Sequence, residues 1–280
     1  MPEPKKWNIL SEILCIRTFD QKEKRKVLLR AGIRAGSLSL FFFIIGMALL
    51  FSQGVVEDGL QSGTISEDFV NTTLKFSTHQ ITPTGVFFSS YIHRTDDNRS
   101  HLENNLKTYA VYAIFIVFLV IVRECTKFPL PSHYYHWLIG ILFIAFPPLF
   151  ACIFKLYDIF LHQDSGMVCC GFSGIAFALI GVFTALFLHY LVNALSCVKI
   201  HSKLIALLQN PVLILVCGII LSFFFALSVG LYNGNHYVHI AGLIGGFIVA
   251  YSLEILLKLH SQPLYHPRRP RDRPLGNRRP

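Results

Sequence analysis

Four side chains in this chain have the chemistry that an acyl-transfer reaction needs. Ser173, in the string GFSG, is a candidate nucleophile, and His239 is a candidate for the base that a nucleophilic serine requires within hydrogen-bond reach. The oxyanion of a tetrahedral intermediate needs hydrogen-bond donors, and the side chains of His101 and Asn105 could provide them. Because these residues lie far apart in the sequence, they can form one site only if the helices that carry them bring them together.

Each of these residues also has an ordinary structural interpretation. A serine among small residues on a membrane helix more often packs or donates to a carbonyl than attacks a substrate. A single histidine in an apolar segment is more often a structural hydrogen-bonding residue than a base. The catalytic interpretation therefore requires that the four side chains meet at one place.

The composition places the chain in a membrane. Of its 280 residues, 53% are hydrophobic and 15% are charged, whereas a soluble domain has about 25% charged residues. So few polar side chains cannot cover a soluble globule of this size, and so many apolar ones exclude intrinsic disorder.

Six stretches are apolar over the roughly 20 residues that a helix needs to cross the hydrocarbon core. They are 37–56, 104–122, 137–157, 171–195, 207–229 and 237–257. Segments of this length are helices rather than strands, because backbone groups in lipid must be satisfied within the segment. We therefore predict an all-α membrane protein built as a bundle of six transmembrane helices.

Basic residues gather on one side of this predicted bundle. The net charge is +9, and Lys and Arg lie mainly in the two tails and in the second and fourth loops. Because basic loops stay in the cytosol, both termini are predicted to be cytosolic. The chain then divides into a basic tail (1–36), a membrane domain (37–257) with a long outer loop (57–100), and a disordered Pro/Arg-rich tail (258–280). The tails can meet anionic headgroups of the lipid bilayer, and no nucleic-acid-binding module is recognisable.

The predicted topology brings the four candidate residues to one depth. The second, fourth and sixth spans all run from the outside to the cytosol, and the candidates lie at the starts of these three spans. They therefore share the outer part of the bilayer, on helices that could face one another. Polar residues at such depth are costly and indicate a functional site.

Strings around these residues resemble the rhomboid family of intramembrane serine proteases. They are HLENN (101–105), GFSGIAFALIG (171–181) and HIAGLIGG (239–246), preceded by FFSSYIH (87–93). The resemblance covers about residues 84–257 and includes the order and the number of spans. It implies a rhomboid-like six-helix bundle that hydrolyses peptide bonds with a Ser–His dyad, without a metal or a cofactor.

The resemblance implies a role for each candidate. Ser173 would be the nucleophile, and His239 would be the general base and then the general acid. The side chains of His101 and Asn105, with the backbone N–H of Ser173, would form the oxyanion hole. The partners would be single-span membrane proteins, cut at a small residue where their helix is weak near the outer leaflet.

Five further residues would support the dyad. Phe177 lies one turn after the serine, on the same helix face, and matches the aromatic residue that the family packs against the base. Gly242 and Gly246 form a GxxxG step that lets the sixth span approach the fourth closely. Gly171 and Gly174 flank the serine in the family's motif.

The first outer loop departs from the family pattern, and two other functions stay open. The loop lacks the Trp–Arg pair that many members use to shape it, and the stretch from His93 to His101 is longer than usual. One alternative is an inert rhomboid relative that binds client proteins in trafficking or degradation, although such relatives usually lack the serine or the histidine. Another is a small transporter, which would use broken helices in corresponding halves. No zinc motif of the type HExxH is present.

Overall fold

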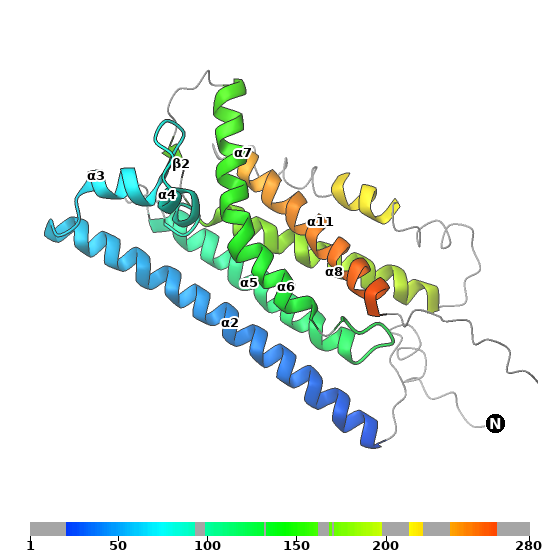
Figure 1. The fold of residues 1–280 in the computed structure, drawn as a ribbon. Coiled ribbons are helices and arrows are strands. Elements are labelled where there is room, and N and C mark those ends of the chain that lie inside the picture. The colour runs from blue at the N-terminus through cyan, green and yellow to red at the C-terminus, as the bar shows by residue number, and fades with distance from the viewer. Residues whose placement is uncertain are drawn as a thin grey trace, which may run out of the picture.

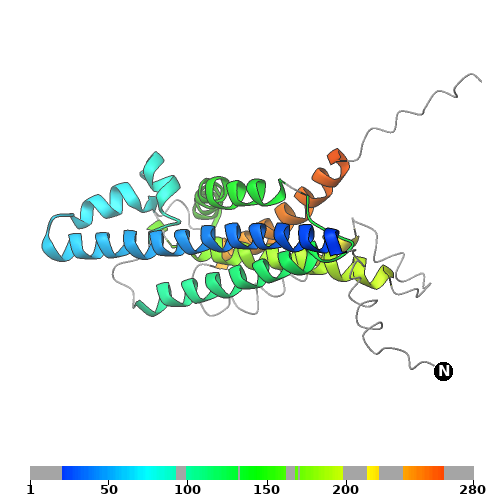
Figure 2. The same cartoon turned by 90° about the horizontal axis from the view of Figure 1, so that it is seen from below.

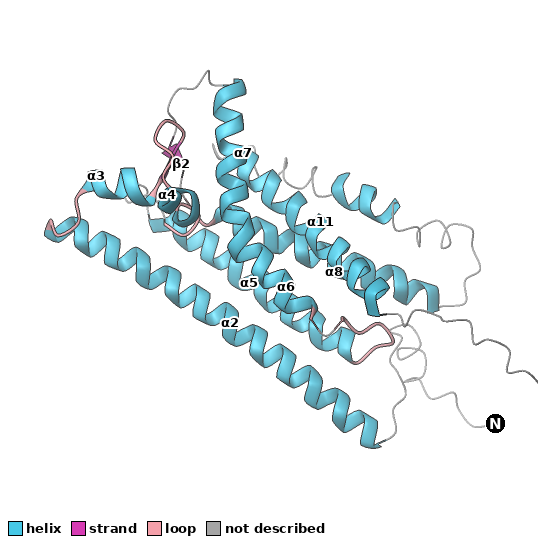
Figure 3. Ribbon diagram, in the orientation of Figure 1, coloured by secondary structure: helices cyan, strands magenta, loops and turns pink. Residues whose placement is uncertain are grey.

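The computed structural model describes residues 21–92, 99–131, 133–161, 168–169, 171–197, 213–220 and 236–261. Long helices make up most of this part of the chain (Figures 1 and 3). The first twenty residues and the predicted tail beyond residue 261 lie outside the described residues. The predicted fifth span also lies largely outside them, and its described part, 213–220, is helical.

Five helical stretches in the described residues are long and apolar enough to cross a membrane. They are Gln21–Ser62, Leu102–Glu124, Tyr134–Phe160, Ser173–Leu195 and Tyr237–His260. These stretches overlap the first four predicted spans and the sixth. The chain is therefore mostly helical and has the composition of a multi-pass membrane protein.

The order of the long helices across the bundle follows their contacts. Helix α2 (Gln21–Ser62) packs on α5 (Arg99–Glu124), α5 packs on α8 (Ser173–Cys197), and α8 packs on α11 (His236–Ser261). In both views α2 and α5 run alongside each other (Figures 1 and 2), and Figure 1 shows α2 at the edge of the bundle. Helix α8, which carries the candidate serine, lies between α5 and α11.

The first helix is much longer than its predicted span. Helix α2 runs from Gln21 to Ser62, whereas we expected a tail up to residue 36 and a span over 37–56. The stretch 21–36 is rich in Lys, Arg, Leu and Ala, which are good helix formers, so the helix begins inside the predicted tail. Gly63 follows it with φ = +73°, the left-handed conformation that closes many helices.

The third predicted span consists of three pieces. They are α6 (Tyr134–Gly140), the π-helical η2 (Ile141–Ala145) and α7 (Phe146–Leu161). The carbonyl of Phe143 would accept a hydrogen bond from residue 147 in an α-helix and from residue 148 in a π-helix, but both are prolines and have no N–H. The hydroxyl of Tyr91 donates to this carbonyl instead. Burial raises the pKa of Tyr91 to about 12, so the hydroxyl keeps its proton.

The long outer loop is built from short elements that are fastened to the third and fourth spans. It contains α3 (Glu67–Phe69), the π-helical η1 (Val70–Leu74), β1 (Phe76–Ser77) and α4 (Pro83–Phe88). Strand β1 pairs antiparallel with β2 (Val168–Cys169), a two-stranded sheet that the sequence did not lead us to expect. Next to the sheet, the hydroxyl of Thr78 donates to the buried carboxylate of Asp158 on α7. These contacts anchor the loop in a chain that lacks the Trp–Arg pair.

Buried charges tie three of the long helices together at the end of the bundle that lies opposite the outer loop. The guanidinium of Arg123 donates to both carboxylate oxygens of Glu254, at 2.7 and 2.5 Å. His189 Nδ1 and Lys258 Nζ lie 2.9 and 2.6 Å from the same carboxylate. We expected Arg123 in a cytosolic loop, but it ends α5 and is fully buried. A separate pair, Arg34 with Glu124, joins α2 to α5 at this end.

Candidate functional site

Ser173 is the first residue of α8, and its position depends on a glycine just before it. Gly171 has φ = +125°, a conformation that residues with a Cβ rarely adopt. Its N–H donates to the carbonyl of Ser89 at 2.7 Å, which connects the entry to α8 with the end of the outer loop. Ser173 itself is 3% exposed. The first N–H groups of a helix have no partner within the helix, so the serine lies beside natural donors for an oxyanion.

His239 lies near the start of α11 and is stacked on an aromatic ring from α8. The imidazole and the ring of Phe177 have centroids 4.3 Å apart and planes within 4° of parallel. His239 is 4% exposed, and Phe177 is buried as well. Since Phe177 follows Ser173 by one helical turn, the stack places the histidine on the face of α8 that carries the serine.

Glycines bring the backbones of α8 and α11 into direct contact along this face. A Cβ added at Gly242 would overlap the carbonyl oxygen of Gly174, and one added at Gly246 would overlap the carbonyl oxygen of Ala178. From the other side, a Cβ at Gly181 would overlap the carbonyl oxygen of Leu243. Gly174 directly follows Ser173, and Gly242 lies three residues after His239. The serine and the histidine therefore lie at the same end of this helix contact.

Gly174 also leaves room for the side chains that surround the start of α8. A Cβ at this position would lie 2.7 Å from a ring carbon of Phe150 on α7 and 2.7 Å from Cγ1 of Val238 on α11. Three helices thus converge on the residue next to the serine. Packing therefore explains why position 174 is a glycine, and the positive φ explains why position 171 is one.

Asn105 is a buried residue of helix α5, which packs on α8. It is 7% exposed, and its Nδ2 has no hydrogen-bond partner among the residues that the structure describes. Tyr109, one turn further along α5, packs edge-to-face on Phe172 with centroids 5.1 Å apart. The buried amide of Asn105 therefore lies one helical turn from the contact between α5 and the residue that precedes Ser173. His101 lies in α5 one turn before Asn105, but its side chain lies outside the described part of the structure.

Two polar contacts near the site were missed from the sequence, and one of them had a readable signal. Successive prolines at 147 and 148 imply that a carbonyl about four residues earlier lacks its helical partner, so a donor such as Tyr91 could have been sought. The bond between Thr78 and Asp158 had no such signal, because it joins residues that are 80 positions apart. In the described residues, no group of three His, Cys, Asp or Glu side chains could hold a metal ion.

Comparison with known proteins added no relative. A scan of protein-family models, a search of curated proteins and a search of solved structures found no match to this chain. Its function is therefore inferred from its own residues and their geometry.

Proposed function

We propose that the chain is an intramembrane serine endopeptidase of the rhomboid type, which cleaves transmembrane segments of single-span membrane proteins. In this proposal six helices cross the bilayer, both termini are cytosolic, and the site lies in the outer leaflet. The observation that carries the proposal is the stack of His239 on Phe177, one helical turn from the buried Ser173. A histidine whose ring orientation is fixed by this stack can act as the base for one side chain on α8.

The proposed reaction proceeds through an acyl-enzyme. Oγ of Ser173 attacks the scissile carbonyl carbon while His239 accepts the hydroxyl proton. The amide C–N bond then breaks, and His239 returns the proton to the leaving amine. A water molecule attacks the resulting ester with the same histidine as base, which releases the carboxylic acid and restores the serine.

The charge that develops on the carbonyl oxygen would be stabilised by donors that are already in place. Asn105 supplies a buried amide N–H, and the first turn of α8 supplies backbone N–H groups. Fixed donors are effective here because they need no reorganisation when the charge appears. In this proposal the imidazole is oriented by its stack on Phe177 and requires no third catalytic carboxylate.

The position at helix ends suits a substrate that is itself a helix. A transmembrane substrate must unwind locally to expose its scissile carbonyl, and Gly or other small residues lower the cost of unwinding. A site at the outer ends of α8 and α11 would receive water from the outer face and such a segment from the bilayer. The substrate class itself is the one that the resemblance to rhomboid proteases implies.

The test is cleavage of a single-span protein with a Gly-containing helix by the full chain reconstituted in liposomes. The wild type is expected to cut within the helix, and Ser173→Ala is expected to abolish the cut. Thr184→Val is the matched control, because Thr184 lies on the same helix and its hydroxyl donates to the carbonyl of Ile180 within that helix, at 2.8 Å. Equal cleavage by Ser173→Ala would refute the proposal, as would a folded wild type that binds the substrate without cutting it.

A further inference from the structure

Asn105 and Arg123 lie on one face of α5, near opposite ends of the helix. They are separated by 18 positions, which is five turns and about 27 Å along the axis. Both side chains are buried. Because the rise per residue in a helix is fixed, an axial shift of α5 at Arg123 moves Asn105 by the same distance.

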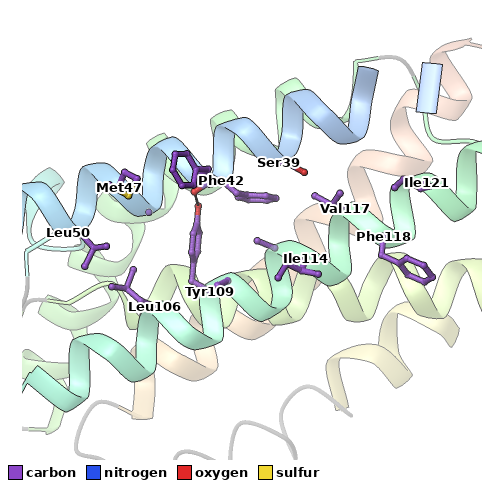
Figure 4. A pocket seen from close by; sticks show the side chains of 14 residues that line it. Ser39, Phe42, Met47, Leu50, Leu106, Tyr109, Ile114, Val117, Phe118 and Ile121 are labelled. Carbon is purple, nitrogen blue, oxygen red and sulfur yellow. Dashed lines mark hydrogen bonds between the residues drawn. The ribbon is translucent and has the colours of Figure 1, made fainter. Parts of the chain in front are cut away.

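Helix α5 packs on α2 and α8, and its contact with α2 is loose. A cavity of about 590 Å³ separates α2 from α5 and is lined mostly by apolar side chains (Figure 4). The hydroxyl of Tyr109 reaches across the cavity and donates to the carbonyl of Phe42 at 2.9 Å. This bond ties α5 to α2, but α2 carries no candidate site residue. The contact with α2 therefore does not place α5 relative to Ser173 and His239.

The contact of α5 with α8 is made by aromatic rings. Tyr109 packs on Phe172. Tyr112 and Phe115 both pack on Phe183, with ring centroids 5.9 and 5.5 Å apart. Because apolar attraction is non-directional, these rings fix the axial position of α5 less sharply than hydrogen bonds of defined length and angle would.

A directional contact joins α5 to α11 at the end of the bundle opposite the outer loop. The guanidinium of Arg123 donates to both carboxylate oxygens of Glu254, at 2.7 and 2.5 Å, and its Nε donates to the carbonyl of Phe128 at 3.1 Å. Two parallel hydrogen bonds between planar groups fix distance and angle together. Both side chains are fully buried, so water does not compete for these bonds. The pair therefore sets the axial position of α5 against the helix that carries His239.

The proposed site needs this position, because its groups lie on three helices. Glycine contacts between α8 and α11 place Ser173 relative to His239, whereas Asn105 depends on where α5 lies. We infer that Arg123 and Glu254 are positioning residues that hold Asn105 level with the start of α8, where its amide can serve the proposed oxyanion; this inference rests on the proposed function. A misplacement of about 1 Å in such a site can cost about a hundredfold in rate.

The test replaces the pair by apolar side chains, Arg123→Met with Glu254→Leu, in the full chain reconstituted in liposomes. Such a replacement of a buried ion pair often leaves stability unchanged or higher, and Lys258, whose side chain is 37% exposed, can turn toward water. For the Gly-containing substrate, kcat should fall about thirtyfold at similar KM. Glu254→Asp, which keeps the charge but shortens the side chain by one methylene, is a second probe and should also lower kcat. Full activity of both variants would overturn the inference.

A double-mutant cycle separates positioning from a general loss of structure. In an Asn105→Ala background, the Met–Leu replacement should have little further effect on kcat, because the donor that the pair positions is already absent. Residues this far apart normally contribute independently. Coupling between Asn105 and the pair would therefore support positioning, and additive losses would overturn it.

The matched control replaces the neighbouring pair, Arg34→Met with Glu124→Leu. This pair lies at the same end of α5 but joins it to α2, so kcat should stay near the wild-type value. An equal loss of kcat in both double variants would show that loosening this end of α5 is sufficient, and it would overturn the inference.

The position of α5 is measured without catalysis by spin labels on genetically encoded residues at Lys107 and Tyr237. Both positions are exposed and lie near the outer ends of α5 and α11. The distribution of distances between the labels should shift or broaden in the Met–Leu variant and stay unchanged in the control. An unchanged distribution in the Met–Leu variant would overturn the inference even if cleavage is lost. A wild type without cleavage would refute the proposed function, and the distances would still decide whether the pair fixes α5.

Discussion

The imidazole of His239 lies flat on the ring of Phe177, and this contact restricts how the histidine can turn. The resemblance to rhomboid proteases implied this pairing, and the one-turn spacing predicted that Phe177 shares a helix face with Ser173. The burial of Asn105 depends on which faces of distant elements meet, and the prolines at 147 and 148 indicate a carbonyl without a partner but not that Tyr91 is its donor. The burial of Asn105 and the identity of this donor required the structure.

Tyr91 gives a prediction about a single hydrogen bond. Tyr91→Phe should lower the free energy of unfolding by about 1–3 kcal/mol, because it leaves the buried carbonyl of Phe143 without a donor. Tyr112→Phe should change it little, since the structure describes ring contacts for Tyr112 but no bond from its hydroxyl to a described residue. Unfolding in mixed micelles would measure both, and equal effects would contradict the role given to Tyr91.

At the scale of elements, the packing of α8 against α11 decides whether the serine and the histidine meet. Their backbones touch at glycines on both helices. Because these glycines have no side chains, the two helices lie close enough for His239 to contact α8. The GxxxG step at 242 and 246 predicted this approach from sequence. The additional contact at Gly181, whose added Cβ would overlap the carbonyl oxygen of Leu243, was not predicted.

Two neighbouring glycines on α11 make this packing testable. Gly242→Ala should reduce kcat by about a hundredfold, because its Cβ would push α11 away from the carbonyl of Gly174 and displace the base by about 1 Å. Gly245→Ala should keep most of the activity, because its Cβ would meet only the ring edge of Phe146, at 3.3 Å. Cleavage kinetics with one substrate would compare them, and similar kcat values would count against the packing account.

At the scale of the molecule, the outer loop and the opposite end of the bundle are held by different means. The loop is held by the β1–β2 pair and by the hydrogen bond from Thr78 to Asp158. The opposite end is held by the ion pairs around Glu254. Sequence reasoning found the apolar spans because hydropathy is a local property. It assigned Arg123 to a solvated loop because its partner, Glu254, lies 131 residues away.

The ion pairs around Glu254 should contribute strongly to the stability of the whole bundle. Glu254→Gln removes the negative charge between Arg123, His189 and Lys258, and breaking a buried pair in this way costs about 3–5 kcal/mol. Glu103→Gln removes an exposed partner of Lys107 and should cost no more than about 1 kcal/mol. Denaturation in micelles would separate the two, and an equally small effect of both would show that the buried charges are not required.

The central claim is that Ser173 is a nucleophile activated by His239. It is tested most directly by treating the reconstituted full chain with a fluorophosphonate and locating the adduct by mass spectrometry. The account predicts one adduct on Ser173, formed by the folded wild type and lost in His239→Ala. A folded wild type that stays unlabelled, or a label on Ser173 that persists without His239, would contradict it.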